Sequence, residues 1–301
     1  MVDFRSLEVF YWVATLESFG RAAERLYTTQ PAVSQRIAAL EEEFGGRLLE
    51  RSGRATRPTP RGRQLLGYAD RLLRLRTEMI RNVATPERMS GLIRLGVSET
   101  IVHTWLSDFI GVVSRRYPLV TFDIEVDVTP KLRAGLARQE LDLAFLAGPV
   151  NEPDIVDLDL GSVPLSFICD SGRRFEAEPV PAAELARHAF VTYQKNSQVF
   201  LQIQQAFHAA TATTPRIHAS SSLATIVRMA LDGIGIAIIP TSVIGPELAR
   251  GELRRLDTML DMPPLRFTAS YRLSPDAILV PALAEISGEV ARNHAGTHKP
   301  G

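Results

Sequence analysis

The 43 residues from Arg21 to Arg63 constrain the fold of this chain more than any other stretch. They first predict a short helix that is capped by Ser18 and buried through small apolar side chains. A second helix is predicted after Thr28 and Thr29, and a segment rich in arginine follows it. Parts in this order can place one helix in the major groove of DNA while basic side chains hold the flanking phosphates. The stretch therefore predicts sequence-specific DNA binding.

The second predicted helix leaves polar side chains exposed near its N-terminus, because Val33, Ile37 and Leu40 recur at the spacing of a buried face. Glutamine can bind adenine through two hydrogen bonds and arginine can bind guanine, while proline and alanine can contact a thymine methyl group. The predicted DNA-contacting residues are Thr29, Gln30, Pro31, Ala32, Ser34, Gln35, Arg36, Arg51, Arg54 and Arg57. Each alone is more often an ordinary surface residue. The prediction rests on their grouping beside one short helix and a basic segment.

Charge is unevenly distributed along the sequence. The formal net charge of the chain is zero, yet residues 1–85 carry fourteen arginines against ten carboxylates. A local excess of positive charge favours binding to a polyanion, because neutralised phosphates release their counterions. A solvated helix face is the alternative explanation for the arginines between Arg71 and Arg81. It fits those from Arg47 to Arg63 less well, because Glu50 is the one carboxylate among them.

Length and composition limit the class of protein. A chain of 301 residues, 45% hydrophobic and 23% charged, is too long for one ordinary core, so two or three compact units are expected. The sequence contains no basic leader with an apolar run and no apolar stretch of membrane-spanning length. We therefore expect a cytoplasmic protein that makes no contact with a membrane.

Catalysis and metal binding are not expected from the sequence. Cys169 is the single cysteine, which excludes an internal disulfide and a zinc cluster within the chain. No nucleophile motif of the G-x-S-x-G type occurs, and the six histidines show no metal-ligand spacing. The two glycines of Gly233-Ile234-Gly235 lack the fuller spacing and the lysine of a nucleotide-binding loop. No enzymatic activity, metal or cofactor is expected.

A long helix is predicted from Pro60 to about Ala84, because apolar residues recur at three- and four-residue spacing. The apolar stripe consists of Leu65, Leu66, Ala69, Leu72, Leu73, Met79, Ile80 and Val83. Arg76 interrupts it. An exposed helix with such a stripe needs a partner surface. Packing against its own domain is the alternative, and it is less favoured because the small N-terminal unit offers little further surface.

Strands alternate with helices beyond a hinge at Thr85–Gly91. The first set is predicted to have strands at 92–97, 121–126 and 141–146 and helices at 102–117 and 130–138. A crossover at 158–168 leads to strands at 189–193, 216–219 and 234–240 and helices at 197–210 and 222–231. A strand at 265–272 and a helix at 276–292 are predicted to rejoin the first set. This pattern is typical of an α/β fold, and two lobes joined by crossing strands enclose a cleft, as in periplasmic binding proteins.

A binding pocket is predicted at the carboxyl ends of these strands, where loops and helix N-termini converge in open α/β sheets. The candidate residues are Ser98, Glu99, Thr100, His103, Thr129, Ala147, Tyr193, Asn196, Ser197 and Ser221. For any single hydroxyl, helix capping is the more common role, and His103 is more simply a helix residue. The agreement of several polar positions on one crevice favours a ligand site.

The N-terminal motifs closely resemble one known family. The matching runs are Ala32–Glu41, Phe44–Arg51 and Thr59–Gly62, which are similar to the signature of the LysR-type transcriptional regulators. The family commonly has Phe at the position of Leu49, Leu at that of Pro58, and a small or acidic residue at that of Arg61. These departures lie at the basic segment and the start of the long helix, and they leave the predicted DNA-reading helix unchanged.

The resemblance implies a winged helix-turn-helix domain at residues 1–59, a linker helix and hinge at 60–90, and an effector-binding domain at 91–301. Lobe I of that domain would span about 91–162 and 266–295, and lobe II about 163–265. Thr100 and Thr129 fall where family members place effector-binding hydroxyls. Ala147 falls where members that bind aromatic carboxylates often carry arginine, and with Glu99 at the mouth the pocket need not prefer a simple carboxylate.

The resemblance also implies a set of partners. The apolar stripe of the long helix would pair with its copy in a second subunit, and such dimers would assemble into a homotetramer. The ligands would be double-stranded operator DNA with an inverted repeat and a small-molecule effector, and RNA polymerase is a further candidate partner. A solute-binding protein without a role in transcription is the alternative, but it would need an export signal and would not need the DNA-reading helix.

Overall fold

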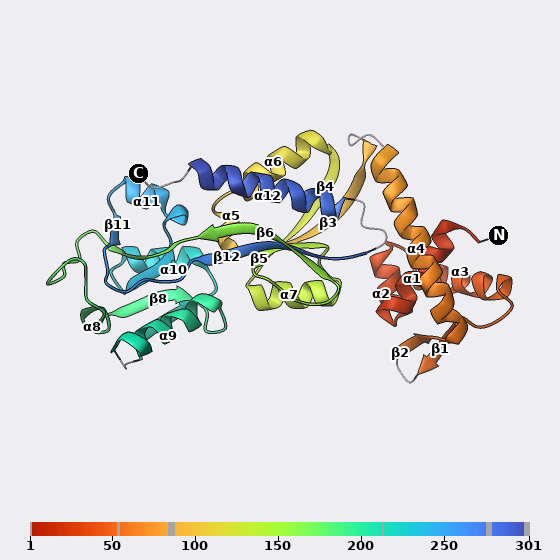
Figure 1. The fold of residues 1–301 in the computed structure, drawn as a ribbon, viewed down its shortest axis with the longest axis horizontal. Coiled ribbons are helices and arrows are strands. Elements are labelled where there is room, and N and C mark those ends of the chain that lie inside the picture. The colour runs from red at the N-terminus through yellow and green to blue at the C-terminus, as the bar shows by residue number, and fades with distance from the viewer. Residues whose placement is uncertain (1, 53–54, 84–87, 212–213, 275–278, 298–301) are drawn as a thin grey trace. The chain divides into compact units, whose positions relative to one another are not determined.

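The computed structural model describes residues 2–52, 55–83, 88–211, 214–274 and 279–297 (Figure 1). The chain divides into two compact units, one containing the N-terminal elements through α4 and the other the elements from β3 onward. No described helix is both long enough and apolar enough to cross a membrane.

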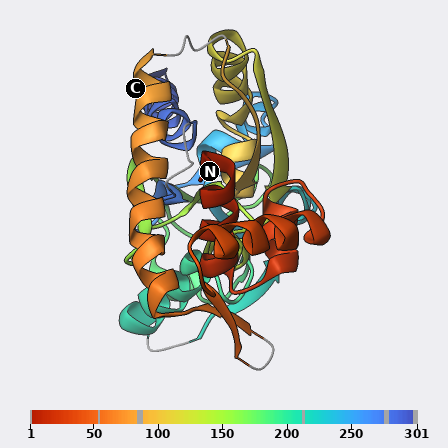
Figure 2. The same ribbon diagram turned by 90° about the vertical axis from the view of Figure 1, so that its right-hand side faces the viewer.

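The N-terminal unit is a small helical domain with a two-stranded hairpin. Its elements are α1 (Phe4–Leu16), α2 (Phe19–Arg25), α3 (Gln30–Glu43), β1 (Leu49–Ser52), β2 (Ala55–Pro58) and α4 (Pro60–Val83). Polar caps begin the first three helices: the side chains of Asp3, Ser18 and Thr29 each accept a hydrogen bond from a backbone N–H of the first turn. Figure 2 shows α4 running beside the three shorter helices, with the hairpin extending from one end.

One core holds these helices together. Phe10, Val33 and Leu48 are buried in it together with residues from α1, α2 and α4. Gly62, in the first turn of α4, allows the helix to approach the hairpin closely, because a Cβ at this position would overlap the carbonyl oxygen of Leu48. The core therefore fixes α3 and the hairpin relative to α4.

The second unit contains two five-stranded sheets, which we call lobe I and lobe II together with their helices. The strands of lobe I are β3 (Ser90–Val97), β4 (Leu119–Val126), β5 (Leu143–Ala147), β6 (Ile155–Val163) and β12 (Leu265–Arg272). Its helices are α5 (Glu99–Val102), α6 (Leu106–Arg116), α7 (Thr129–Ala137) and α12 (Val280–Thr297). The strand order is β4-β3-β5-β12-β6, with β3 parallel to both β4 and β5.

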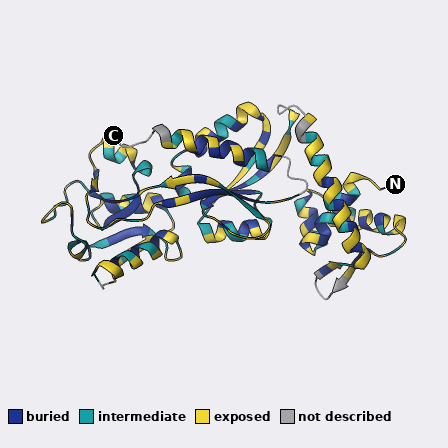
Figure 3. Cartoon of the chain, viewed as in Figure 1, coloured by how far each residue is buried: buried dark blue, intermediate teal, exposed yellow. Residues whose placement is uncertain are grey.

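Lobe II has its own sheet and helices. Its strands are β7 (Leu165–Asp170), β8 (Ala189–Tyr193), β9 (Arg216–Ser220), β10 (Ile236–Pro240) and β11 (Leu253–Leu256). Its helices are α8 (Ala182–Leu185), α9 (Gln198–Thr211), α10 (Leu223–Leu231) and α11 (Gly245–Ala249), with a 3-10 turn, η2 (Thr241–Val243). The strand order is β11-β7-β10-β8-β9. Central strands of both sheets are buried, among them β5 and β12 in lobe I and β7 and β10 in lobe II, whereas the edge strands β4 and β9 have at most one buried residue each (Figure 3).

Two chain segments connect the lobes. β6 of lobe I is followed directly by β7 of lobe II, and β11 of lobe II is followed by β12, which lies between β5 and β6 in lobe I. The fold class predicted from the sequence is confirmed: a helical N-terminal region with a hairpin, a long helix and a two-lobed α/β domain.

Several predicted element boundaries need correction. The helix expected at 102–117 is two helices, α5 and α6, separated at residues 103–105. The crossover expected at 158–168 is made of two long strands, β6 and β7, in different sheets. Strand β11 was not predicted, because Leu253–Leu256 alternates with arginines in a short run that resembles a polar loop. The last helix is observed from Val280, and residues 276–278 of the predicted one lie outside the described residues.

Candidate functional site

The first two turns of α3 present a polar surface. Val33, Ile37 and Leu40 are buried in the core of the N-terminal unit, which orients the opposite side of the helix outward. The exposed residues on that side are Thr29, Gln30, Pro31, Ser34, Gln35 and Arg36, whereas Ala32 is half-buried. The helix therefore offers amide, hydroxyl and guanidinium groups, the groups that recognise base edges in a major groove.

The turn between α2 and α3 sets the direction of that surface. Tyr27 adopts a left-handed backbone conformation with φ 51°, and the backbone N–H of Thr28 donates to the carbonyl of Ala23 at 2.9 Å. Thr29 then caps α3 by accepting a hydrogen bond from the N–H of Ala32 at 3.4 Å. The chain thus reverses within four residues, from Leu26 to Thr29. A turn this short fixes the angle at which α3 leaves α2.

Arg36 and Arg57 are cations beside this surface. Arg36 Nη1 lies 3.9 Å from Asp3 Oδ2, and its side chain is 45% exposed. Arg57, on β2, lies 3.7 Å from Glu17 Oε1 and is 61% exposed. Exposed ion pairs at these distances hold their groups weakly, so a phosphate can replace the carboxylate. Of the other predicted wing residues, the side chain of Arg51 and all of Arg54 lie outside what the structure describes.

Backbone carbonyls bind the arginines that flank the start of α4. Arg61 Nη1 donates to the carbonyl of Gly45 at 3.2 Å, and Arg63 Nη1 donates to the carbonyl of Pro58 at 2.9 Å. Both side chains therefore tie the start of α4 to neighbouring loops. This contact gives Arg61, a departure from the family pattern, a structural role at the base of the wing.

The predicted apolar stripe of α4 divides into two sides, which corrects part of the sequence-based prediction. Leu65, Ala69 and Leu73 are buried by the chain's own residues and cannot form a face for a second subunit. Leu66 is also packed against the N-terminal core. The N-terminal domain therefore covers more of α4 than the small size of the domain suggested.

The other side of α4 carries large exposed apolar groups. These are Tyr68, Leu72, Leu75, Met79 and Val83, whose side chains are between 42% and 79% exposed. Their spacing of four, three, four and four residues places them along one face of the helix. Tyr68 and Leu75 were not part of the predicted stripe. Ile80 is half-buried.

A cleft of about 940 Å³ lies in the second unit, lined by residues of both lobes. Its lining from lobe I includes the segments after three strands, β3, β4 and β5, and its lining from lobe II includes the segments after β8 and β9. Nine of the ten predicted pocket residues line it: Ser98, Glu99, Thr100, Thr129, Ala147, Tyr193, Asn196, Ser197 and Ser221. His103 is not among the described lining residues. Its Nε2 lies 3.9 Å from Glu99 Oε1, one turn further along the chain.

Two hydrogen bonds cross from lobe I to lobe II at this cleft. The hydroxyls of Thr100 and Tyr193 are 3.0 Å apart, and Glu99 Oε2 accepts from the backbone N–H of Leu223 at 2.5 Å. Desolvation raises the pKa of Tyr193 well above its ordinary value, and the hydrogen bond from Thr100 opposes that rise only in part. The phenol therefore stays protonated at neutral pH and can donate or accept within the cleft.

Sequence reasoning missed two sets of lining residues. Gln198, Val199, Leu201, Gln202 and Gln205 of α9 line the cleft, while Phe200, Ile203 and Phe207 of the same helix are buried and do not line it. The spacing of these glutamines could have revealed them, because it places them on one helical face. Asp127, Lys131 and Arg133 of lobe I also line the cleft, and so do Leu265 and Phe267 of the returning strand. No local sequence pattern identifies Leu265 and Phe267 as lining residues.

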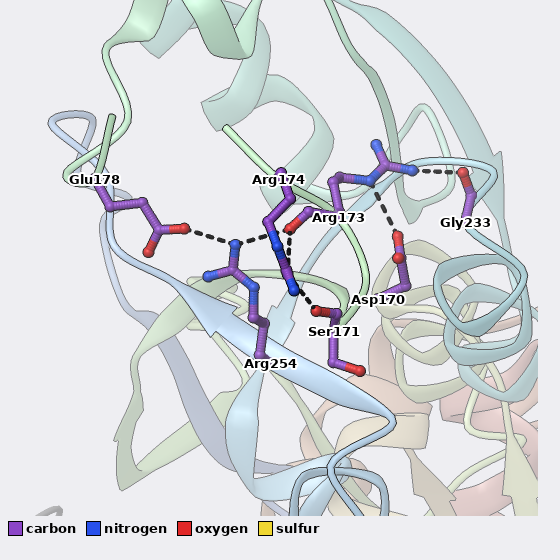
Figure 4. A network of polar contacts seen from close by, with 7 residues as sticks. All are labelled: Asp170, Ser171, Arg173, Arg174, Glu178, Gly233 and Arg254. Atoms are coloured by element: carbon purple, nitrogen blue, oxygen red, sulfur yellow. Dashed lines mark hydrogen bonds and ion pairs between the residues drawn. The ribbon is translucent and has the colours of Figure 1, made fainter. Parts of the chain in front are cut away.

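A network of charged groups braces lobe II (Figure 4). Arg173 donates to Asp170 Oδ2 at 3.0 Å and to the carbonyl of Gly233 at 2.5 Å. Arg254 donates to Glu178 at 2.6 Å, and this hydrogen bond holds the pKa of the Glu178 carboxyl below its usual value. None of these five residues is among those that line the cleft. The network stabilises the loop after β7 rather than a ligand.

Metal and thiol chemistry gain no support from the described part of the chain. Within it, no group of three or more His, Cys, Asp or Glu side chains is arranged to hold a metal ion. Cys169 is buried, and desolvation raises the pKa of its thiol, so the thiolate is disfavoured at neutral pH. The arrangement at the cleft is suited to binding.

Comparisons with known proteins agree with this geometry. Residues 4–63 match the family model of the bacterial regulatory helix-turn-helix proteins of the lysR family, and residues 86–285 match that of the LysR substrate binding domain. A probable RuBisCO transcriptional regulator of Cyanophora paradoxa is 30% identical over 257 residues, covering 82% of this chain and 79% of its own. The HTH-type transcriptional regulator BbuR of Bordetella bronchiseptica is 28% identical over 255 residues, covering 84% and 78%.

A solved structure extends the likeness to the fold of the whole chain. A single-residue variant of full-length OxyR from Pseudomonas aeruginosa superposes with a TM-score of 0.63, at 24% identity, covering 97% of this chain and 95% of that one. The helix-turn-helix unit, the cleft between two α/β lobes and both family matches lead to one conclusion: this chain belongs to the LysR family of transcriptional regulators and carries an effector-binding domain.

Proposed function

We propose that the exposed N-terminal turns of α3 read the bases of an operator and that the arginines of the β1-β2 wing hold its phosphates. The observation that carries this proposal is the outward orientation of Gln30, Gln35 and Arg36 on a helix whose other side is buried. Base-edge contacts give sequence discrimination, and contacts to phosphate give affinity that depends on salt. The protein acts by binding rather than by catalysis, and it acts where chromosomal DNA is, in the cytoplasm.

The assembly that presents two such helices is proposed to form through α4. The exposed face at Tyr68, Leu72, Leu75, Met79 and Val83 supports it, because a helix with a continuous apolar face gains stability by pairing. A two-fold dimer would place two α3 helices on one face of the DNA and would match an operator with an inverted repeat. Two dimers would associate into the tetramer that the family resemblance implies.

The cleft is proposed to bind the effector and to transmit its presence. A ligand that contacts both lobes favours one angle between them, which redistributes conformations that already exist. The hydrogen bond between the hydroxyls of Thr100 and Tyr193 and the one that Glu99 accepts from the N–H of Leu223 support this mechanism, because each must lengthen or break if the lobes separate. A change in lobe angle would alter the spacing of DNA-binding domains in the oligomer and so the binding or bending of the operator.

A DNA-binding experiment tests this function. The full chain would be titrated against DNA fragments from the region upstream of its own gene at several salt concentrations. The expected result is a preferred fragment whose affinity falls steeply as salt rises, and a footprint with two-fold symmetry. Equal affinity for all fragments, or an affinity insensitive to salt, would contradict the proposed reading of DNA by α3 and the wing.

A further inference from the structure

Glu99 carries a negative charge into a position where a ligand's carboxylate would be expected. Its Oε2 accepts a hydrogen bond at 2.5 Å from the N–H of Leu223, the first residue of the nine-residue helix α10. The side chain is 23% exposed. The first N–H groups of a helix attract anions, since they lack partners within the helix and lie at the positive end of its dipole. A carboxylate of lobe I thus occupies the anion-binding end of a lobe II helix.

Other donors of the cleft that could hold an anion also have partners within the chain. Ser222 and Ser197 cap α10 and α9 by accepting hydrogen bonds from backbone N–H groups of those helices. Lys131 Nζ lies 2.7 Å from Asp127 Oδ2, and Arg133 Nη2 donates to the carbonyl of Pro149 at 2.7 Å. Among the described lining residues, Lys131 is therefore paired with a carboxylate and both helix ends are capped, while Arg133 donates to a neutral carbonyl and its Nε is buried without a hydrogen-bond partner.

Oxygen atoms that can accept hydrogen bonds remain along the same cleft. The His103 Nε2 atom lies 3.9 Å from Glu99 Oε1, which is beyond hydrogen-bonding distance. Ser98 Oγ and Gln202 Oε1 are buried atoms of described residues for which no hydrogen-bond partner is found. Glu99 Oε1 and Gln202 Oε1 can accept hydrogen bonds, whereas the Ser98 hydroxyl can either donate or accept. Val126 and Leu201 expose apolar surface in the same cleft and are 48% and 50% exposed.

We propose that Glu99 determines the specificity of the cleft by excluding a ligand carboxylate from α10 and by selecting an effector that carries a protonated amine. The ammonium group donates to Glu99 Oε1, and the apolar body of the effector lies against Val126 and Leu201. An amine bound in this way leaves the bond from Glu99 to Leu223 intact, so it stabilises the contact between the lobes. This inference rests on the proposed role of the cleft as the effector site.

Matched small molecules test the charge preference. Hexylamine, hexanoate and hexanol share an apolar chain and differ in head group, and their dissociation constants would be measured by calorimetry on the full chain. Because a hydrogen bond to a charged group is stronger than a neutral one, hexylamine is expected to bind at least about tenfold more tightly than hexanoate. Tighter binding of hexanoate, equal binding, or binding of none of the three would overturn the proposal.

Two variants, each lacking one carboxylate, distinguish the effect of Glu99 from the effect of the total charge of the cleft. Glu99→Gln keeps the side-chain size and an oxygen for the N–H of Leu223 but removes the charge, so the amine-to-carboxylate preference should fall to about one. Asp127→Asn removes a carboxylate from the same cleft that is already paired with Lys131, and it should retain the preference. Loss of the preference in both variants, or in neither, would contradict a specific role for Glu99.

Chemical rescue tests the placement of Glu99 at α10 without an effector. Glu99→Ala should lower the midpoint of thermal unfolding, and acetate should restore part of the loss whereas methylammonium should not. If acetate acts equally on Glu99→Ala, Asp127→Ala and the wild type, the carboxylate does not hold the helix end. Salt-dependent binding of each variant to the preferred upstream fragment is measured in parallel. If the chain keeps this DNA binding but fails the amine test, the proposed function as a regulator stands and only the assigned effector class is wrong.

Discussion

The polar surface of α3 and the cleft between the lobes are built in opposite ways. The α3 surface comes from one continuous run, Gln30 to Arg36, and its polar groups point outward from a buried core. The cleft draws on segments more than a hundred residues apart, such as Ser98 and Ser221, and many of its polar groups bind one another. The polar groups of α3 are exposed and available to a partner, whereas many polar groups of the cleft already bind other groups of the chain. We therefore expect substitutions to affect the two surfaces independently.

The largest effect is expected from a cavity on the buried side of α4. Leu73→Ala deletes a side chain that is 1% exposed, and such changes cost about 2–5 kcal/mol in protein cores. Hydrogen exchange should become faster in α1 and α4 and stay unchanged in lobes I and II. Leu72→Ala, at the neighbouring and 42% exposed position, is the matched control and should weaken self-association while leaving the core intact. Similar exchange rates in both variants would show that the two sides of α4 are not distinct.

Loss of base-reading groups comes next. Gln30→Ala and Arg36→Ala should each reduce discrimination between the operator and random DNA by about 1–3 kcal/mol, because each removes a group able to make two hydrogen bonds to a base. Competition binding assays measure this ratio. Arg138→Ala, an exposed arginine of lobe I, serves as control and should leave the ratio unaltered. A reduced affinity for all DNA without loss of discrimination would assign Arg36 to the phosphates instead.

A smaller effect is expected for the hydroxyl pair in the cleft. Thr100→Val and Tyr193→Phe each remove one partner of the 3.0 Å contact, and the coupling in a double-mutant cycle should be about 0.5–1.5 kcal/mol. Denaturant unfolding of the second unit provides the four free energies. DNA affinity in the absence of ligand should hardly change. Additive effects of the two substitutions would mean that the hydroxyls do not stabilise each other across the lobes.

The smallest effect concerns the brace in lobe II and depends on pH. Arg254 lowers the pKa of Glu178 in the folded chain, so the ion pair adds stability above the ordinary carboxyl pKa of about 4.3. That contribution is lost as pH falls through the lowered folded value. Glu178→Gln should therefore be slightly less stable than the wild type at pH 7, with curves that converge in acid. A difference that grows as pH falls would contradict the assignment.

Sequence patterns could predict what is local. The caps at Ser18 and Thr29, the buried face at Val33 and Ile37, and the strand boundaries of β8 and β12 follow from spacing and side-chain chemistry within a few residues. Nine pocket residues were identified because the carboxyl ends of parallel strands converge whatever the details of packing. The family resemblance supplied the order of domains.

Features that depend on contacts between distant residues were not predictable. The division of α4 required knowing that Leu65 and Ala69 meet the N-terminal core, which apolar spacing alone does not reveal. The hydrogen bond that Glu99 accepts from the backbone N–H of Leu223 joins positions 124 residues apart, so no local sequence pattern predicts it. Phe267 reaches the cleft because β12 returns to lobe I beside β5. In each case the contacts of the side chain are set by packing between residues that are distant in the sequence.

The position of β12 has a consequence for synthesis of the chain. Lobe II is continuous in sequence from Leu165 to Leu256, so a nascent chain can complete it as soon as that segment has left the ribosome. Lobe I lacks a strand between β5 and β6 until Arg272 has emerged. A product that terminates before β12 would keep the helix-turn-helix segment while two strand edges stay open, and open edges promote aggregation. Translation must therefore pass Arg272 before lobe I, and with it the cleft, can form.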